Sequence, residues 1–390
     1  MSNLYFDNAA TTFPSPESVK EYVRILNKFP GNPSSSHTLG KKSKEFLEKT
    51  RESVASSLDL DNKNEIYFTS CATESNNIVL QSLLFLNKKG RVILTNSEHP
   101  SISNNQTILK QYGFDVKIAK SKNGIVTLNA IEELLNEDTI LVELIYINNI
   151  LGTKNDILSL GDCIKSYSNK IGKTILFHTD AVQTIGKTEI SLNELKKHGV
   201  TSASFSGHKF YAPRGTGILF STSPLIHSLS RSGGQENGTR GGTENLASIG
   251  STAFALKNTI ENIKNDINTI SKLKNIFLEK LSQTQIKYKI LSHLDNSTSV
   301  PNILSLSIMG LPGEVCVRAL SEKGIFIGTT SACSANAKSE EKNALSVMGY
   351  SKDVSTNAIR ISFSHDQTEE DIHKCVTALN NVYNEYSTYA

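Results

Sequence analysis

The chain has 390 residues, of which 38% are hydrophobic and 20% charged, with a formal net charge of +3. Without a dense block of lysine or arginine, this balance argues against nucleic acid as a partner, and the length predicts two domains or one large α/β domain with an appendage. No apolar run reaches membrane-spanning length and the first residues lack the pattern of a secretory signal, so we expect no membrane partner and a cytoplasmic protein.

The first two thirds of the chain alternate short apolar runs with amphipathic stretches. One such stretch, residues 74–89, has a helical pattern. This alternation is typical of βαβ units and predicts an α/β fold whose sheet is mostly parallel and covered on both faces. The predicted strands are residues 64–69, 90–95, 115–119, 139–147, 173–179, 201–206 and 216–220.

The pattern changes near residue 255. Residues 254–283 form one long helical pattern, followed by two further strand-like runs and two further helical stretches. We therefore expect a large domain over residues 15–255 and a smaller α/β domain made of residues 1–14 and 256–390. The predicted elements of the smaller domain are residues 302–308, 313–324, 358–364 and 368–386.

Polar side chains follow the predicted strands of the large domain. Ligands of open parallel sheets bind at the carboxyl ends of the strands, so these side chains predict one shared site. They include a carboxylate, two amides, two imidazoles and one amine. The residues are His99, Asn149, Asp180, Gln183, His208 and Lys209.

A strand-end lysine paired with a strand-end aspartate indicates pyridoxal phosphate chemistry. Lys209 would hold the aldehyde as a Schiff base and Asp180 would keep the pyridine nitrogen protonated. A helix beginning at "CATES" offers backbone N–H groups and Thr73 to the phosphate. Each residue also has a simpler interpretation: Lys209 pointing to solvent, Asp180 capping a helix, and His99 serving as a turn residue before Pro100.

The five cysteines form no paired spacing, which fits free thiols in a reducing compartment and gives no indication of a metal site. Cys333 lies in the polar, small-residue stretch "GTTSACSANAKSEEKNA", as expected for an exposed nucleophile on a loop. The others follow apolar or helical patterns and are interpreted as structural, except one beside the phosphate-binding turn. The structural three are Cys163, Cys316 and Cys375, and the exception is Cys71.

Eight motifs along the chain resemble those of one known family. They are "YFDNAATT", "GNPSSSHTLG", "FTSCATESNN", "SEHPSI", "FHTDAVQTIGK", "SFSGHKFYAPRGTG", "GGQENGTRGGTEN" and "SACS". In this order they are similar to the NifS/IscS-type cysteine desulfurases of the class-V aminotransferases, from about residue 4 to about residue 380. The resemblance implies the fold type I architecture of pyridoxal-phosphate-dependent transferases.

The resemblance also implies a role for each matching residue. Around the cofactor ring, Lys209 matches the Schiff-base lysine, Asp180 the partner of the ring nitrogen and Gln183 the partner of the ring hydroxyl. His99 matches a histidine stacked over the ring with an acid/base role. Phosphate-binding positions are matched by Ala72, Thr73, Ser206 and His208, and by Thr243 reaching across from the other subunit.

On the substrate side, Asn149 and Arg360 match residues near the amino acid, and Asn149 also matches a residue near the cofactor. Cys333 matches the nucleophile. The implied reaction converts L-cysteine to L-alanine and leaves the sulfur on Cys333 as a persulfide. The sulfur then passes to an acceptor protein, for example in iron–sulfur cluster assembly or tRNA thiolation. A selenocysteine lyase or other β-lyase, an aminotransferase, and a non-catalytic sulfur carrier remain as alternatives.

A homodimer with shared sites is expected from the glycine-rich segment 231–245, which has no apolar residue to anchor it to its own core. A disordered surface loop is the alternative. The chain departs from the family pattern at Ile150, Ser232 and Thr330, and in residues 338–343 after the nucleophile. These departures concern the partner-facing and loop regions more than the cofactor contacts.

Overall fold

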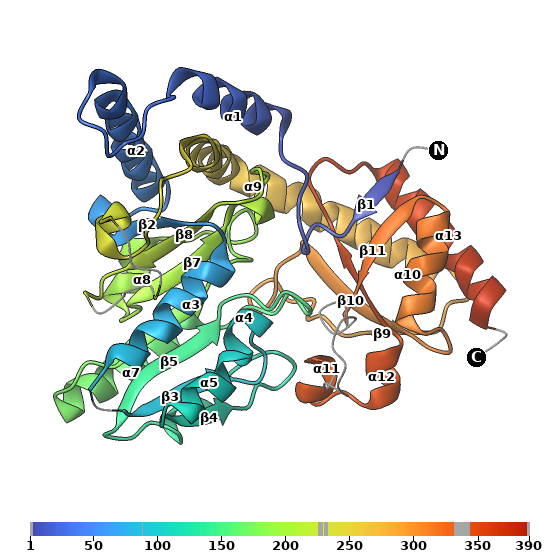
Figure 1. Cartoon of the computed structure of the whole chain (residues 1–390). Coiled ribbons are helices and arrows are strands. Elements are labelled where there is room, and N and C mark those ends of the chain that lie inside the picture. Colours follow the sequence, from blue (N-terminus) through green and yellow to red (C-terminus); the bar gives the residue numbers. More distant parts are fainter. Residues whose placement is uncertain (1–2, 88, 225–228, 230–232, 331–343, 388–390) are drawn as a thin grey trace.

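The computed structural model describes residues 3–87, 89–224, 229, 233–330 and 344–387. Two β-sheets organise the chain, one of seven strands and one of five. Figure 1 shows the larger sheet with its helices on one side of the molecule and the smaller sheet, together with both termini, on the other.

The seven-stranded sheet is parallel except at one strand. Its order is β2 (Ile66–Thr69), β8 (Gly217–Ser221), β7 (Ser202–Ser206), β6 (Leu176–Asp180), β5 (Thr139–Ile145), β3 (Arg91–Thr95) and β4 (Asp115–Ala119). Only β8 runs antiparallel to its neighbours β2 and β7. Residues 207–216, which join β7 to β8, are too few for the helical crossover that a parallel neighbour needs. The predicted α/β fold with a mostly parallel sheet is confirmed.

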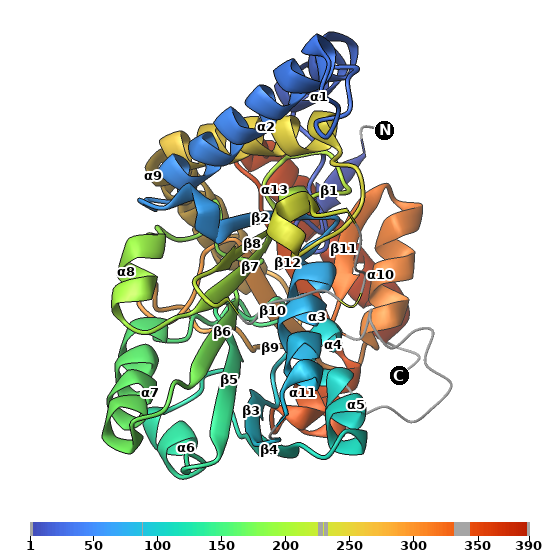
Figure 2. The ribbon, with the colours of Figure 1, turned by 60° about the vertical axis from the view of Figure 1, so that its left-hand side comes forward.

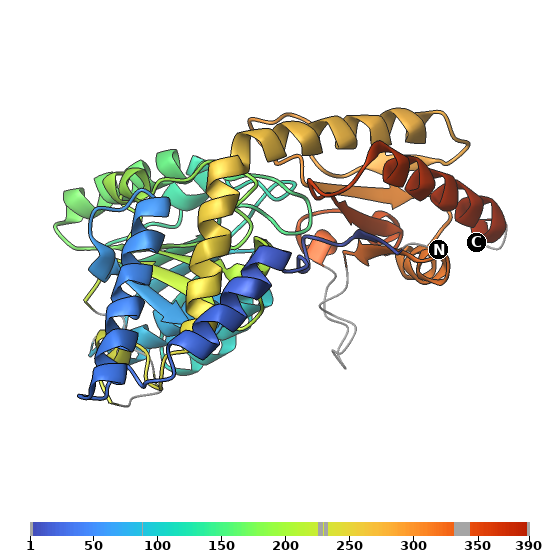
Figure 3. The ribbon, with the colours of Figure 1, turned by 90° about the horizontal axis from the view of Figure 1, so that it is seen from above.

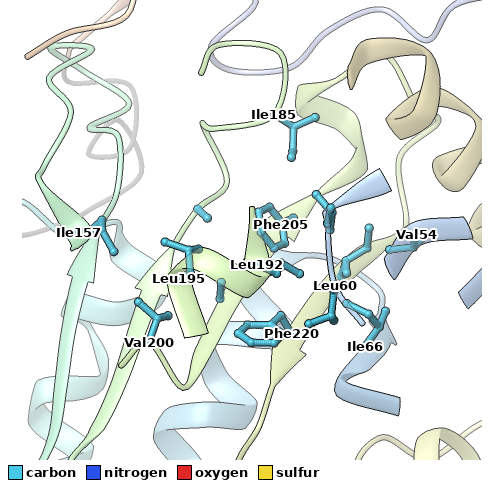
Figure 4. Close-up of a cluster of buried hydrophobic side chains, with 14 of the residues drawn as sticks. Val54, Leu60, Ile66, Ile157, Ile185, Leu192, Leu195, Val200, Phe205 and Phe220 are labelled. Carbon is cyan, nitrogen blue, oxygen red and sulfur yellow. The ribbon is translucent and has the colours of Figure 1, made fainter. Parts of the chain in front are cut away.

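Helices cover both faces of this sheet, because its strands are apolar on both sides. One face packs against α3 (Ala72–Ser82) and its extension η2 (Leu83–Phe85), α4 (Pro100–Ser103) and α5 (Asn105–Gln111). The other packs against α2 (Thr38–Ser57), α7 (Ile157–Ile171), α8 (Leu192–Lys197) and the start of α9 (Leu246–Ser282). Figure 2 shows α3 and α8 on opposite sides of the sheet, and Figure 4 shows Val54, Leu192 and Phe220 in the core.

Short elements complete this part of the chain. They are α1 (Pro16–Lys28), which lies against α9, α6 (Leu128–Glu132), which lies against α7, and the 3-10 turns η1 (Lys63–Glu65), η3 (Gly207–Lys209) and η4 (Gln235–Gly238). No described helix, α9 included, combines the length and the apolar character that a bilayer crossing requires.

The five-stranded sheet has the order β1 (Leu4–Phe6), β11 (Ile325–Thr329), β12 (Ala358–Ser362), β10 (Ile303–Ile308) and β9 (Tyr288–Ile290). The N-terminal strand β1 pairs in parallel with β11, whereas the other neighbours are antiparallel. Its core includes residues of α10 (Gly313–Glu322), α13 (Glu369–Tyr386) and the second half of α9. Two short helices, α11 (Ala344–Val347) and α12 (Lys352–Thr356), precede β12.

Helix α9 joins the two parts of the molecule. Its residues Leu246 to Leu256 belong to the core of the large sheet, and Ile270 to Leu281 belong to the core of the small sheet. Figure 3 shows the helix running from one part into the other. The expected boundary at residue 255 therefore falls inside a helix, which begins before the predicted start at residue 254. The division into residues 15–255 and the remainder stays a prediction.

The glycine-rich segment before α9 is anchored to its own chain by a buried ion pair. Glu236, 5% exposed, forms two hydrogen bonds with the guanidinium of Arg51, at 2.7 and 2.9 Å, and accepts the backbone N–H of Phe68 at 2.8 Å. Glu236 and Asn237 adopt left-handed backbone conformations, with φ of 47° and 54°. In the described residues 233–245 this polar contact ties the segment to its own chain, an anchor that the sequence pattern did not indicate.

We predict that Glu236→Ala destabilises the protein by roughly 3–5 kcal/mol, because the Arg51 guanidinium would stay buried without its counter-charge. Urea denaturation measures this change. Glu261→Ala is the matched control: its carboxylate pairs with Lys257 at an exposed surface, where an ion pair contributes about 0–1 kcal/mol. Equal losses of unfolding free energy for the two substitutions would show that the buried ion pair stabilises the protein no more than the exposed one does.

Candidate active site

A pocket of about 330 Å³ lies at the carboxyl ends of the strands of the larger sheet. It collects all but two of the residues that the sequence predicted for the site: Ala72, Thr73, His99, Asn149, Asp180, Gln183, Ser206, His208, Lys209 and Arg360. Ala9 and Ala10 of the N-terminal segment also line it. Thr243 is exposed on the segment before α9 and does not line the pocket, and Cys333 lies outside the described residues.

Asp180 is the last residue of β6 and is 3% exposed. Its Oδ2 accepts a hydrogen bond from Asn76 Nδ2 at 2.9 Å, and its Oδ1 accepts the backbone N–H of Val182 at 3.1 Å. A buried carboxylate is costly unless such donors replace water. The site thus offers a fixed negative charge on its floor.

Lys209 ends the 3-10 turn η3, directly after β7. Its Nζ donates to the backbone carbonyls of Ala9 at 2.8 Å and Ala10 at 2.6 Å, so the amine ties the N-terminal segment to the pocket. Lys187 lies behind it, 7% exposed, with its Nζ 3.5 Å from the carbonyl oxygen of Lys209. Burial, and then the positive charge of Lys209, lower the pKa of Lys187 to about 7.

His99 caps the short helix α4, its Nδ1 accepting the backbone N–H of Ser101 at 3.1 Å. Burial lowers the pKa of His99, the negative charge of Asp180 opposes this shift, and the charge of Lys209 adds to it. His208, whose Nδ1 lies 3.1 Å from the Thr11 hydroxyl, has a pKa lowered to about 4 by burial and by Lys209. His99 and His208 are therefore neutral near pH 7.

One rim of the pocket presents hydrogen-bond donors suited to an anion. Helix α3 begins at Ala72, and its N-cap residue Cys71 provides no side-chain cap for the first turn. Free backbone N–H groups at a helix N-terminus attract negative charge. Ser206 and His208 line the same pocket. Gln183 donates from Nε2 to the Ala9 carbonyl at 2.9 Å, whereas its buried Oε1 has no hydrogen-bond partner.

Arg360 brings the small sheet to the pocket. Its guanidinium donates to the Asn149 carbonyl at 2.9 Å and to Asp7 Oδ1 at 2.7 Å, while its buried Nε has no partner. Gly328 on the adjacent strand leaves room for this pair, since a Cβ there would lie 2.6 Å from Asp7 Oδ1. The arrangement can hold a carboxylate, the group that arginine binds best.

Five polar residues around the site escaped the sequence prediction: Asp7, Asn76, Ser101, His178 and Lys187. All five occur within the family-like motifs as quoted from the sequence, yet nothing in one sequence identifies their partners. His178 was readable as a polar interruption of the β6 run. It is fully buried, with Nε2 3.1 Å from Asn76 Oδ1 and Nδ1 2.9 Å from the Ser202 hydroxyl.

Two buried carboxyl groups also lie near Asp180. Burial raises the pKa of Glu98 to about 8, and burial and the neighbouring Glu98 raise that of Glu143 well above its usual range. Glu98 is therefore mostly protonated near pH 7, and the raised pKa of Glu143 favours its neutral form. Among the described residues, no group of three or more His, Cys, Asp or Glu side chains could hold a metal ion.

The remaining cysteines are described and free. Cys316 and Cys375 are buried in the core of the small sheet, and Cys163 is partly buried with its sulfur 3.6 Å from Glu132 Oε1. Cys71 lines the pocket itself, at the start of α3.

Comparison with known proteins identifies the family. The sequence model of the family Aminotransferase class-V matches residues 4–375. The chain belongs to this family. Its fold is thus that of the type I pyridoxal-phosphate-dependent transferases, as the motifs predicted.

Curated class-V relatives match almost the whole chain. A NifS/IcsS protein homolog of Lactobacillus delbrueckii is 36% identical, covering 98% of each chain. The cysteine desulfurase IscS of Clostridium botulinum is 33% identical, covering 95% of this chain and 91% of its own. A solved NifS-like protein superposes with a TM-score of 0.89 at 33% identity, covering 98% of this chain and 100% of its own. The resemblance to the NifS/IscS-type proteins is confirmed.

The neutral, buried His178 predicts a specific pH dependence of stability. Burial lowers its pKa to about 3 in the folded chain, against about 6.5 when unfolded, so the unfolded state binds more protons between these values. Stability from this group is present above pH 6.5 and is lost as the pH falls toward 3. Between pH 7 and pH 5, the stability advantage of wild type over His178→Gln should shrink by about 2 kcal/mol.

Denaturant unfolding at the two pH values measures this advantage. Thr377→Ser, at an exposed position of α13, is the control: it changes no titratable group, so its difference from wild type should stay constant between the two pH values. A stability advantage over His178→Gln that does not change with pH would contradict the lowered pKa.

Proposed function

We propose that this protein is a pyridoxal-phosphate-dependent cysteine desulfurase, which converts L-cysteine to L-alanine and retains the sulfur as a persulfide on Cys333. One observation carries the proposal: the Lys209 amine, the buried Asp180 carboxylate and the Arg360 guanidinium line one pocket. The names of its relatives, among them cysteine desulfurase IscS, support the same reaction.

The residues of the pocket fit pyridoxal phosphate. When bound, this cofactor supplies an aldehyde that forms a Schiff base with an amine and a cationic ring that withdraws electrons from the substrate's α-carbon. The first turn of α3 with Thr73, Ser206 and His208 would hold the phosphate, and Thr243 of a second subunit would complete its binding. Asp180 would face the protonated ring nitrogen, and the unpartnered Gln183 Oε1 would accept a hydrogen bond from the ring hydroxyl.

Three side chains would act on the amino acid. Arg360 would bind its carboxylate, with the neighbouring Asn149 holding the guanidinium in place through its carbonyl oxygen. Lys209 would take the α-proton as a free amine, because a neutral amine is a strong base at a desolvated site. His99 would contact the cofactor ring as a neutral imidazole.

The sulfur step needs Cys333, whose segment lies outside the described residues. Its thiolate would attack the sulfur of the substrate, forming an S–S bond as the C–S bond breaks and its electron pair returns to carbon. Protonation of that carbon and return of a proton to the α-carbon would then give alanine, and the enzyme would keep one sulfur atom more than before. The polar, small-residue sequence around Cys333 suits a loop that carries this sulfur to an acceptor protein.

Three further features belong to the proposal. The acceptor would be a scaffold or carrier protein of iron–sulfur cluster assembly or tRNA thiolation, the working compartment would be the cytoplasm, and the active unit would be a homodimer. An exposed apolar surface on α1 supports association, with Val19, Val23 and Leu26 between 43% and 57% exposed.

Incubating the purified protein with L-cysteine tests the reaction. We expect alanine and a persulfide on Cys333, identified by mass spectrometry, and sulfide when a thiol reductant is added. Cys333→Ser should still bind pyridoxal phosphate and L-cysteine but release no sulfur, because Lys209, Asp180 and Arg360 are unchanged. Lys209→Ala should lose the yellow colour of the Schiff base and form no alanine.

Other outcomes would favour the alternatives. Near-normal sulfur release by Cys333→Ser would assign the nucleophile elsewhere, with Cys71 as the next candidate because it lines the pocket. Pyruvate or the amine form of the cofactor instead of alanine would indicate a β-lyase or an aminotransferase. Faster turnover of L-selenocysteine, with no need for Cys333, would indicate a selenocysteine lyase.

The shared-site homodimer has its own test. Sedimentation of the protein loaded with pyridoxal phosphate should give a dimer at assay concentrations, and conditions that dissociate it should release the cofactor in parallel. A monomer with full activity and retained cofactor would contradict the shared site.

A further inference from the structure

A buried hydrogen-bond network lies beneath the pocket, and the amide of Asn76 is its centre. This side chain comes from the first half of α3 and is fully buried. Its Nδ2 lies 2.9 Å from Asp180 Oδ2 and 2.9 Å from the Ser101 hydroxyl, and its Oδ1 lies 3.1 Å from His178 Nε2. The Asn76 amide therefore contacts Asp180 directly and is linked to His99 through the Ser101 hydroxyl.

The chemistry of each group assigns the hydrogens of Asn76 and of the His178 ring, and the Ser204 hydroxyl, 3.4 Å from His178 Nε2, can accept the same His178 hydrogen. A carboxylate only accepts, so Asn76 presents its NH₂ group to Asp180, and the second N–H points to Ser101. The amide oxygen must then accept from His178, which places the His178 hydrogen on Nε2. The Nδ1 of His178 is left to accept from the Ser202 hydroxyl, 2.9 Å away. With its pKa lowered to about 3, His178 keeps this neutral form throughout the neutral range.

The same reasoning extends to His99. Because Asn76 donates to the Ser101 oxygen, the Ser101 hydroxyl hydrogen is available to His99 Nδ1, 2.9 Å away. The backbone N–H of Ser101 also points at Nδ1, at 3.1 Å. A ring nitrogen that accepts two hydrogen bonds carries no hydrogen, so the hydrogen of neutral His99 lies on Nε2.

We propose that Asn76 is a positioning residue that orients the Asp180 carboxylate and, through Ser101, keeps the hydrogen of His99 on Nε2. This inference deepens the proposed function. His99 then offers an N–H rather than a lone pair at Nε2, so it acts toward the ring or substrate as a hydrogen-bond donor. Lys209 is left as the group that accepts the α-proton.

Histidine ¹⁵N chemical shifts, measured on the cofactor-free protein, test the hydrogen assignment directly, because they report which ring nitrogen carries hydrogen. The His99 resonances are identified by their absence in His99→Gln. We expect the Nε2–H form in wild type and a loss of that preference in both Asn76→Ala and Ser101→Ala. Asn262→Ala is the control: the exposed amide of Asn262 on α9 donates to the Asn258 carbonyl, so its removal should leave His99 unchanged.

Pyridoxal phosphate affinity separates the two contacts of Asn76. Ser101→Ala leaves the bond from Asn76 to Asp180, so it should alter the His99 form and keep the cofactor dissociation constant within about two-fold. Asn76→Ala also removes the bond to Asp180 and should weaken cofactor binding by about ten-fold or more, the effect of one hydrogen bond to a charged group. Absorbance titration measures both.

The proposal is overturned if wild-type His99 carries its hydrogen on Nδ1, or if Asn76→Ala and Ser101→Ala both leave it on Nε2. It is also overturned if Asn76→Ala binds pyridoxal phosphate as wild type does. The wild-type spectrum needs no substitution, so the test stands even if Asn76→Ala fails to fold. The spectra are recorded without cofactor or substrate. Their result therefore does not depend on whether the protein carries out the proposed reaction.

Discussion

The burial of one carboxylate constrains the architecture of this site. Asp180 ends β6 where water is excluded, and a bare negative charge there would cost several kcal/mol. Donors must come from the protein, and one of them, Asn76, is 104 residues away along the chain. It reaches Asp180 only because α3 lies across the sheet on the side of β6 and β7. The packing of α3 on the sheet therefore also supplies a hydrogen-bond donor to the buried charge.

The other titratable groups of the region follow from that charge. Close to Asp180, the raised pKa values of the Glu98 and Glu143 carboxyl groups favour their neutral forms over further negative charge. The buried histidine His178 stays neutral, and its hydrogen satisfies the amide that solvates Asp180. The positive charge of Lys209 lies at the open side of the same pocket. The site therefore separates one anion on its floor from cations at its rim.

Much of this arrangement was predictable from sequence. The strand ends near His99, Asp180 and Lys209 are local patterns, and parallel strands necessarily bring such ends to one edge of a sheet. The start of α9 at Leu246 has a local signal that the prediction missed, because the side chain of its N-cap residue Asn245 accepts the backbone N–H of Ser248. The anchoring of Glu236 by Arg51 and the role of Asn76 were not predictable. Each depends on a partner distant in the chain, and a single sequence does not say which polar residues face each other. Thr243 lies outside the pocket of its own chain, and its expected phosphate contact belongs to the proposed homodimer.

The pairing of β1 with β11 has a consequence for the order in which the protein forms during synthesis. Residues Leu4 to Phe6 are synthesised long before their partners Ile325 to Ile327. The strands of the large sheet can associate while β1 is unpaired, and β1 cannot take its place in the small sheet until β11 has been synthesised. Ala9 and Ala10, which accept the Lys209 amine, come soon after β1 in the chain. A complete site is therefore a late product of translation, and a truncated chain would leave it open.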